Sequence, residues 1–148
     1  QYEDPSREEE LSSPRHYALG LAHKHIPEIV AQGGLAVEPI FCPIICDFPQ
    51  GMVVALPLHG VGAQVAEDCY RTYYQGERLI AVTHAPESGF FGANNQAGRD
   101  DLELLVCGQA DRAVAYARLD NLGKGASGAA VQNMNIMLGF PELTGLAL

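Results

Sequence analysis

The sequence predicts an α+β domain in which an antiparallel or mixed sheet is covered by helices. Three observations favour this fold class. Apolar residues alternate along several segments as in strands, whereas other segments repeat them at helical spacing. Apolar residues make up 47% of the chain and charged residues 18%, which is enough for a core and too little charge for a disordered protein. The length of 148 residues favours a single core.

The first fourteen residues differ from the rest in composition. They place the acidic run Glu8–Glu10 between two prolines, Pro5 and Pro14. Such a segment buries little apolar surface, so we expect residues 1–14 to form an exposed arm or linker. The single domain is then expected over residues 15–148.

The next elements are a short helix and two strands. The helix opens at Pro27, where a missing N–H does no harm, and ends at Gly33-Gly34. Residues 37–45 are expected to be extended, with their prolines restricting them to an edge or a bulge. A stronger strand over 51–58 is expected to pair with them in a hairpin with a long loop. The faces of these two strands are Val37, Phe41 and Ile45, and Met52, Val54, Leu56 and Leu58.

The second half continues the alternation of strands and helices. A helix is predicted over 63–75, and its buried face is expected to hold Val65, Ala66, Cys69 and Tyr73. Further strands are predicted over 78–84, 102–107 and 113–119, with a Gly- and Asn-rich loop over 88–98. A last helix ends at Gly139, where Pro141 blocks its continuation. One side of this helix carries Ala126, Ala130, Met134, Met137 and Leu138.

Composition also excludes several classes of function. Nine basic residues against eighteen acidic ones give a net charge of -9, which argues against nucleic acid or an anionic membrane as a partner. No apolar run approaches the roughly 20 residues that span a bilayer. Four cysteines are present, and Cys69 and Cys107 fall in apolar-patterned segments where a thiol behaves as a small buried hydrophobe. We therefore expect reduced cysteines in a cytoplasmic protein.

The first candidate site is the His23-Lys24-His25 segment before the helix at Pro27. One histidine can act as a general acid or base with a single orienting partner, and the following helix start would disfavour a protonated ring. A metal site is a minor alternative, in which Cys42 and Cys46 would complete the ligand set. Both histidines could also be ordinary polar residues at a helix entrance.

The second candidate site is the glycine-rich segment 119–128. A predicted strand runs into glycines and then into a helix, so free N–H groups and the Lys124 ammonium could bind an anion or a phosphate. The spacing is neither that of a P-loop nor, at this end of the chain, that of a dinucleotide fold. The competing explanation is that these glycines allow close packing at a helix start.

Three segments resemble one family, the N-acetyl-gamma-glutamyl-phosphate reductases of the semialdehyde dehydrogenase superfamily. They are HKHIPEI at residues 23–29, FPQGM at 48–52 and LDNLGKGASGAAVQNMNIMLGFPELTGL at 119–146. The resemblance implies a fold like the C-terminal domain of glyceraldehyde-3-phosphate and aspartate-semialdehyde dehydrogenases. It also implies that the chain, which begins at Gln1 and not at Met, is the second half of an enzyme whose N-terminal Rossmann domain is absent here.

The resemblance further implies an activity. Members of the family reduce N-acetylglutamyl phosphate to N-acetylglutamate semialdehyde with NADPH, in arginine biosynthesis. A cysteine thiolate expels phosphate from the acyl phosphate, and hydride then reduces the thioester. The family's nucleophile stands in a Pro-Gly-Cys-Tyr-Pro segment that does not occur in this sequence. None of the four cysteines therefore inherits that role.

Site roles follow from the same resemblance. His23 matches the acid/base histidine, which would raise the thiolate fraction and later protonate the thiohemiacetal oxygen. Tyr17 matches a residue that shapes the same site, and His25 and Lys124 are expected to contact substrate. Asn121, Gly123 and Gly125 are expected to lie against the nicotinamide of NADP. No metal is expected.

The expected partners are the acyl phosphate, the missing Rossmann domain and a second copy of the chain. Self-association is expected because one set of helices is not enough to cover the apolar strand faces. Two alternatives to an enzyme half stay open. One is a non-catalytic assembly module of the same ancestry, and the other is a small metal-binding protein that uses His and Cys.

Overall fold

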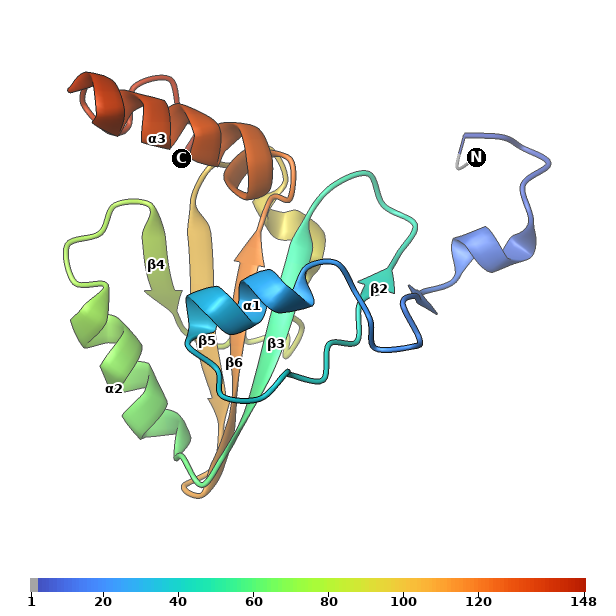
Figure 1. Cartoon of the computed structure of the whole chain (residues 1–148), viewed down its shortest axis with the longest axis horizontal. Helices are drawn as coiled ribbons and strands as arrows, with labels where there is room; N and C mark the ends of the chain where they lie inside the picture. Colours follow the sequence, from blue (N-terminus) through green and yellow to red (C-terminus); the bar gives the residue numbers. More distant parts are fainter. Residues whose placement is uncertain (1–2) are drawn as a thin grey trace. The chain divides into compact units, whose positions relative to one another are not determined.

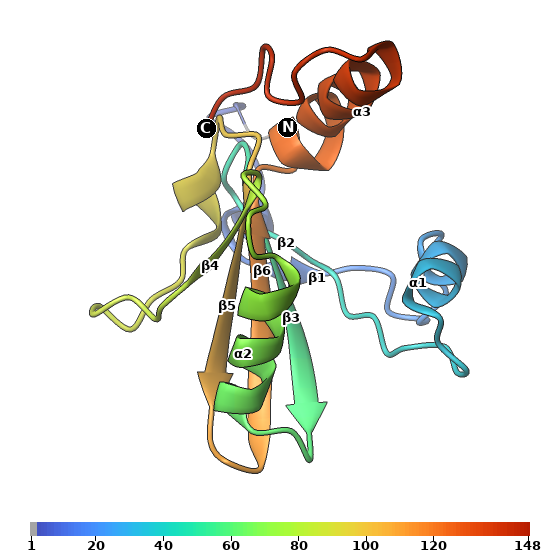
Figure 2. The ribbon, with the colours of Figure 1, turned by 90° about the vertical axis from the view of Figure 1, so that its left-hand side faces the viewer.

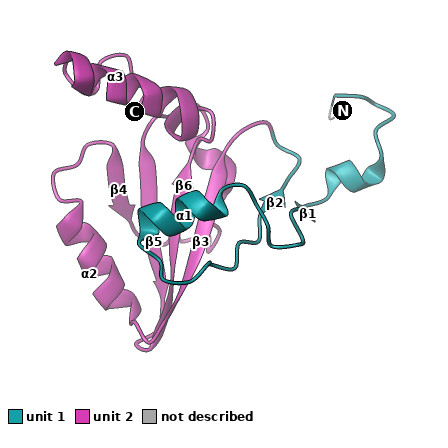
Figure 3. Ribbon diagram, in the orientation of Figure 1, with its two compact units in different colours: residues 1–48 teal, residues 49–148 magenta. Residues whose placement is uncertain are grey.

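The computed structural model describes residues 3–148 and confirms the predicted α+β class. It divides into two compact units, Gln1–Phe48 and Pro49–Leu148 (Figure 3). The boundary between the units in the sequence follows Phe48, whereas composition predicted a boundary after Pro14. The assignment of 15–148 as a substrate-binding and dimerisation domain stays a prediction.

The first unit contains little regular structure (Figure 1). Its strands β1 and β2 form a two-stranded antiparallel ladder in which Arg15 pairs with Ile45. Its helix, α1, begins at Ile26 with Pro27 in the first turn, as predicted, and ends at Gly34, which adopts the left-handed conformation with φ 58°. Elements of this unit are η1 (Glu9–Ser12), β1 (Arg15–His16), α1 (Ile26–Gly33) and β2 (Ile44–Ile45).

The predicted strand over 37–45 and its hairpin are wrong. Only Ile44–Ile45 is a strand, and it pairs with β1 and not with the segment after Gly51. The physical reason is the pair of prolines, Pro39 and Pro43, because neither offers an N–H for a ladder. Pro43 contributes only as an acceptor, since its carbonyl binds the N–H of Tyr17 at 3.2 Å.

The second unit is built on a four-stranded sheet (Figures 1 and 2). The spatial order is β3-β6-β5-β4, with β3, β6 and β5 antiparallel and β4 parallel to β5, so the sheet is mixed. The predicted strands at 51–58, 78–84, 102–107 and 113–119 are all present. Elements of this unit are β3 (Met52–His59), α2 (Ala63–Tyr73), β4 (Ile80–Thr83), η2 (Ala93–Gln96), β5 (Leu102–Gly108), β6 (Arg112–Leu119), η3 (Gly123–Ser127) and α3 (Gly128–Leu138).

The core of this unit lies between α2 and one face of the sheet. Ala66 of α2 packs against Val106 of β5 and against Ala113 and Ala115 of β6. Small alanines on both surfaces let the helix approach the sheet closely. Leu58, Ala63 and Tyr70 surround this cluster.

The predicted buried face of α2 is mostly wrong. Ala66 is buried, but Val65 and Tyr73 are 67% and 77% exposed, and Cys69 is exposed as well. Together with Ala63 and Tyr70, Ala66 forms the contact stripe, at the i, i+3, i+7 spacing of a helix. Side-chain size was therefore a poor guide to the buried face of α2, because the surface that packs on the sheet carries alanine and not the larger apolar residues.

Two apolar surfaces of this unit stay uncovered. Met52, Val54 and Leu56 on β3 share the sheet face that α2 covers, but all three are exposed because α2 packs over the other strands. On α3, the apolar side that includes Met137, which is 84% exposed, also faces away from the core. What α3 buries instead is Gly128 and Asn135.

Candidate active site

The His23 segment forms an aromatic cluster within the first unit. The His23 ring contacts Tyr17, His25 and Phe41 edge-to-face, with ring centroids 5.7, 4.8 and 5.1 Å away. His23 is half-buried, whereas Tyr17 and His25 are exposed. The structure therefore brings together three of the residues that the sequence singled out. It adds Phe41, whose position in the irregular 37–43 segment gave no signal.

The helix start next to His23 orients its ring. Nδ1 of His23 accepts a hydrogen bond from the N–H of His25, the N-cap residue of α1, at 3.2 Å. A ring nitrogen that accepts carries no proton, so the neutral ring holds its proton on Nε2. In this arrangement the neutral imidazole presents its Nε2–H group as a hydrogen-bond donor.

The backbone before His23 adopts an uncommon conformation. Ala18 and Leu21 both have φ of 53°, in the left-handed region that residues with a side chain seldom adopt. Such conformations tend to occur at functional segments, where neighbouring contacts hold them.

The metal-binding alternative would need three or four ligands close together. Within residues 3–148, no three His, Cys, Asp or Glu side chains come together in a group that could hold an ion. All four cysteines are free thiols, with Cys42 and Cys69 exposed and Cys46 and Cys107 half-buried.

The glycine-rich segment of the second unit is organised by Asp120, which directly follows β6. Oδ1 of Asp120 accepts the N–H groups of Leu122 and Gly123 at 2.8 and 3.1 Å, and its carbonyl oxygen accepts the N–H of Gly125 at 2.8 Å. The N–H groups expected to bind an external anion thus donate to the protein's own carboxylate and carbonyl. Lys124 remains as the cationic group of this segment.

Asp120 is also the most enclosed carboxylate of the described residues, with 1% of its surface exposed. Its second oxygen, Oδ2, accepts Nε2 of Gln50 at 2.7 Å and the N–H of Gly98 at 2.5 Å. Burial acts to raise the pKa of Asp120, but these hydrogen bonds outweigh it, so the pKa lies below its ordinary value. Sequence reasoning missed this residue. The available signal was a charge placed between an apolar strand and a run of glycines.

Asn121 and Lys124 project from the same segment. Oδ1 of Asn121 accepts the N–H of Gly51 at 2.8 Å, whereas its exposed Nδ2 group has no acceptor within residues 3–148. Nζ of Lys124 donates to Oε1 of Gln132 at 2.7 Å, and Nε2 of Gln132 donates to Glu142 at 2.7 Å. Asn121 therefore offers a free amide donor, and Lys124 is held by a polar chain.

Close packing accounts for two of the glycines. A Cβ on Gly123 would lie 2.5 Å from the carbonyl oxygen of Arg99, and one on Gly128 would overlap the carboxylate of Asp100. Gly125 is less confined, since its nearest neighbours would be 3.3 Å away. The packing explanation of the sequence pattern thus holds at Gly123 and Gly128.

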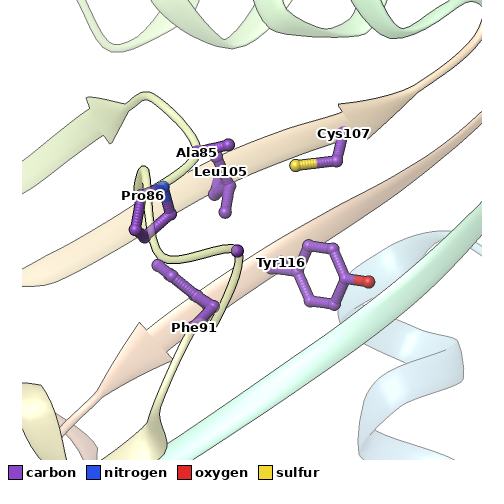
Figure 4. A pocket seen from close by; sticks show the side chains of 7 residues that line it. Ala85, Pro86, Phe91, Leu105, Cys107 and Tyr116 are labelled. Carbon is purple, nitrogen blue, oxygen red and sulfur yellow. The ribbon is translucent and has the colours of Figure 1, made fainter.

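A separate apolar pocket lies on the sheet face opposite α2 (Figure 4). Its volume is about 380 Å³, and the loop after β4 forms one wall while β5 and β6 form the floor. Nothing in the sequence pattern pointed to it. The lining residues are Ala85, Pro86, Gly89, Phe91, Leu105, Cys107 and Tyr116.

Comparison with known proteins places the chain in a family. The sequence pattern of the semialdehyde dehydrogenase dimerisation domain matches residues 3–121. The chain belongs to this family. In the described residues, no helix is both long and apolar enough to cross a membrane.

Similar proteins carry more specific names. An N-acetyl-gamma-glutamyl-phosphate reductase of Brucella anthropi is 42% identical over 94% of the chain and 49% of its own length. A protein of Nostoc named N-acetyl-gamma-glutamyl-phosphate reductase 2 is 40% identical over 88% of the chain and 45% of its own length. An N-acetyl-gamma-glutamyl-phosphate reductase of Rhizobium leguminosarum is 39% identical over 93% of the chain and 48% of its own length. The chain spans about half the length of the curated relatives that it matches.

Proposed function

We propose that this chain is the substrate-binding and dimerisation half of an NADPH-dependent N-acetyl-gamma-glutamyl-phosphate reductase. The observation that carries the proposal is the similarity to proteins of that name, about 40% identical over nearly the whole chain. The reaction would reduce N-acetylglutamyl phosphate to the semialdehyde and release phosphate, in arginine biosynthesis. The nucleophilic cysteine and most of the nucleotide site would belong to a Rossmann half.

In this proposal His23 acts as the general acid. In the neutral ring Nδ1 is occupied by the N–H of His25, so Nε2–H would donate a hydrogen bond to the oxyanion that forms when hydride adds to the thioester. Proton transfer to that oxygen would start from the imidazolium, in which Nδ1 gives up the bond from His25. The Tyr17 and Phe41 rings pack against the imidazole and limit its rotation. The exposed His25 ring would contact the substrate through its ring nitrogens, because its contacts with His23 are an edge-to-face ring contact and a bond from its backbone N–H.

The segment after β6 would hold the reactants. NADPH, when bound, supplies the hydride. The free Nδ2 group of Asn121 fits a carboxamide oxygen, whereas the N–H groups of Gly123 and Gly125 are taken by Asp120. Their N–H groups would therefore not donate to the nicotinamide. Gly125, which is exposed, would contact it through its backbone, whereas one side of Gly123 already packs against Arg99. Lys124 would pair with the substrate phosphate after leaving Gln132.

A histidine substitution in the full reductase polypeptide tests this function. We expect His23→Ala to lower NADPH-dependent reduction of N-acetylglutamyl phosphate by about 10²–10⁴-fold, the range of a lost acid/base group, without weakening NADPH binding. His59→Ala is the matched control, because His59 is an exposed histidine at the end of β3. Undiminished turnover in His23→Ala would remove His23 from the mechanism. Absence of turnover in the parent protein would favour a non-catalytic assembly module.

A further inference from the structure

The buried carboxylate of Asp120 connects three segments that are far apart in the sequence. Gln50 precedes β3, Gly98 lies between η2 and β5, and Leu122 and Gly123 follow β6. Each oxygen accepts two donors, so the carboxylate has exchanged its hydration for four hydrogen bonds. A carboxylate buried this deeply is stable in the folded protein only while these hydrogen-bond partners are in place.

The next residue strengthens the same connection. Oδ1 of Asn121 accepts the N–H of Gly51, which adjoins Gln50. Gly51 has φ of 113°, and a Cβ there would approach within 2.8 Å of the backbone of Asn94, in the loop that leads to Gly98. The segments around 50–51, 94–98 and 120–123 are therefore joined by hydrogen bonds to Asp120 and Asn121 and by the close approach at Gly51.

We propose that Asp120 is a positioning residue, which fixes the backbone turn that carries Asn121 and Lys124 and so places both side chains for cofactor and substrate. This inference rests on the proposed function. Asn121 adjoins Asp120 directly, and the turn that carries Lys124 is closed by the bonds from Leu122, Gly123 and Gly125 to Asp120. The carboxylate thus acts on the reaction through the residues that it holds, and not by touching the reactants.

Replacement by asparagine isolates the effect of charge and acceptor number. Asn keeps the size of the side chain but turns one acceptor oxygen into an N–H donor. If that donor takes the place of Oδ2, it opposes the N–H of Gly98, which cannot reverse its polarity. If it takes the place of Oδ1, it opposes Leu122 and Gly123. Either orientation releases at least one of the three segments.

The test compares Asp120→Asn with its parent in the full reductase polypeptide. We expect the KM for N-acetylglutamyl phosphate and the Kd for NADPH each to rise about tenfold, the effect of one lost hydrogen bond to a charged group, while kcat falls less. Glu67→Gln is the matched control. Glu67 is a half-buried carboxylate on α2 whose ion pair with Arg71 does not involve these segments.

Amide NMR spectra of the 148-residue chain report the local change independently of activity. In the parent, the protons of Gly98, Leu122 and Gly123 should resonate far downfield and exchange slowly. In Asp120→Asn, the protons of at least one segment should lose both properties. If Asp120→Asn does not fold, Gln50→Met removes one donor and leaves three, and a smaller rise in KM and Kd is expected.

The outcomes separate the two proposals. The positioning role would be overturned if the amide protons lose their downfield shift and slow exchange while KM and Kd stay unchanged in Asp120→Asn and Gln50→Met. The proposed reductase function would be unaffected by that result. Unchanged amide signals in Asp120→Asn would overturn the role as well. A parent protein that does not reduce the acyl phosphate would refute the proposed function, and with it the inference that depends on it.

Discussion

Gly128 offers a sharp test of the packing at the start of α3. A Cβ at this position would overlap the carboxylate of Asp100 and lie 2.6 Å from its Cγ and 3.0 Å from its Cβ. Asp100 accepts the N–H of Ala147 through Oδ2 at 2.9 Å, and its own N–H donates to the carbonyl of Ala147 at 2.7 Å. The substitution Gly128→Ala must therefore displace the side chain that holds the last residues of the chain.

The expected loss of stability follows from three contributions. A lost hydrogen bond to a charged acceptor costs about 1.5–3 kcal/mol. Overpacking of a closed site costs about 1–3 kcal/mol. Alanine recovers at most about 1 kcal/mol over glycine in a helix. We therefore expect Gly128→Ala to lower the free energy of unfolding by about 2–4 kcal/mol.

Urea unfolding of the 148-residue chain, at one protein concentration, measures this difference. Gly125→Ala is the graded control, because its nearest neighbours would be 3.3 Å away and a change below about 1 kcal/mol is expected. A double-mutant cycle identifies the cause: in Asp100→Ala, the further change Gly128→Ala should cost little, since the overlapping carboxylate is gone. Equal costs in both backgrounds, or a stable Gly128→Ala, would refute the overlap as the cause.

Three further predictions concern charge, assembly and tautomer. Because the folded pKa of Asp120 is lowered, its stabilising contribution is present above the unfolded value of about 3.9 and is lost as pH falls through the folded pKa. Urea unfolding between pH 6 and 3 should thus show a steeper acid loss in the parent than in Asp120→Asn, and equal slopes would contradict it. Exposed Met52, Val54 and Leu56 predict self-association, which sedimentation measures and a strictly monomeric chain would disprove. Nitrogen-15 NMR of neutral His23 should find the proton on Nε2, and a proton on Nδ1 would be incompatible with the bond from His25.

The elements that the sequence predicts well are those with a clear period. The alternation of apolar residues over 51–58 and 113–119 correctly predicted β3 and β6. Gly34 and Gly139 end helices in the left-handed conformation, as expected of glycine. Strand pairing was harder to predict. Short connections are the usual choice, so the segment before Pro49 was expected to pair with β3. The actual partner of β3 is β6, whose ladder joins His59 to Arg112.

The candidate site shows the same division between local and distant information. The His23 segment was found because its residues lie close together in the sequence, as in the structure. Asp120 was missed because an acidic residue after a strand is most often a solvated turn residue. Its burial depends on Gln50 and Gly98, which lie 70 and 22 residues away. No local pattern contains that information.

The pairing of β3 with β6 also affects how the chain emerges from the ribosome. β3 is synthesised well before its ladder partner, because residues 60–111 must first follow His59. During that interval an apolar strand has no edge to join, and long-range antiparallel pairing is slow to form. A nascent chain that has just completed α2 therefore still carries β3 without its ladder partner, and this strand can pair only after β6 has been synthesised.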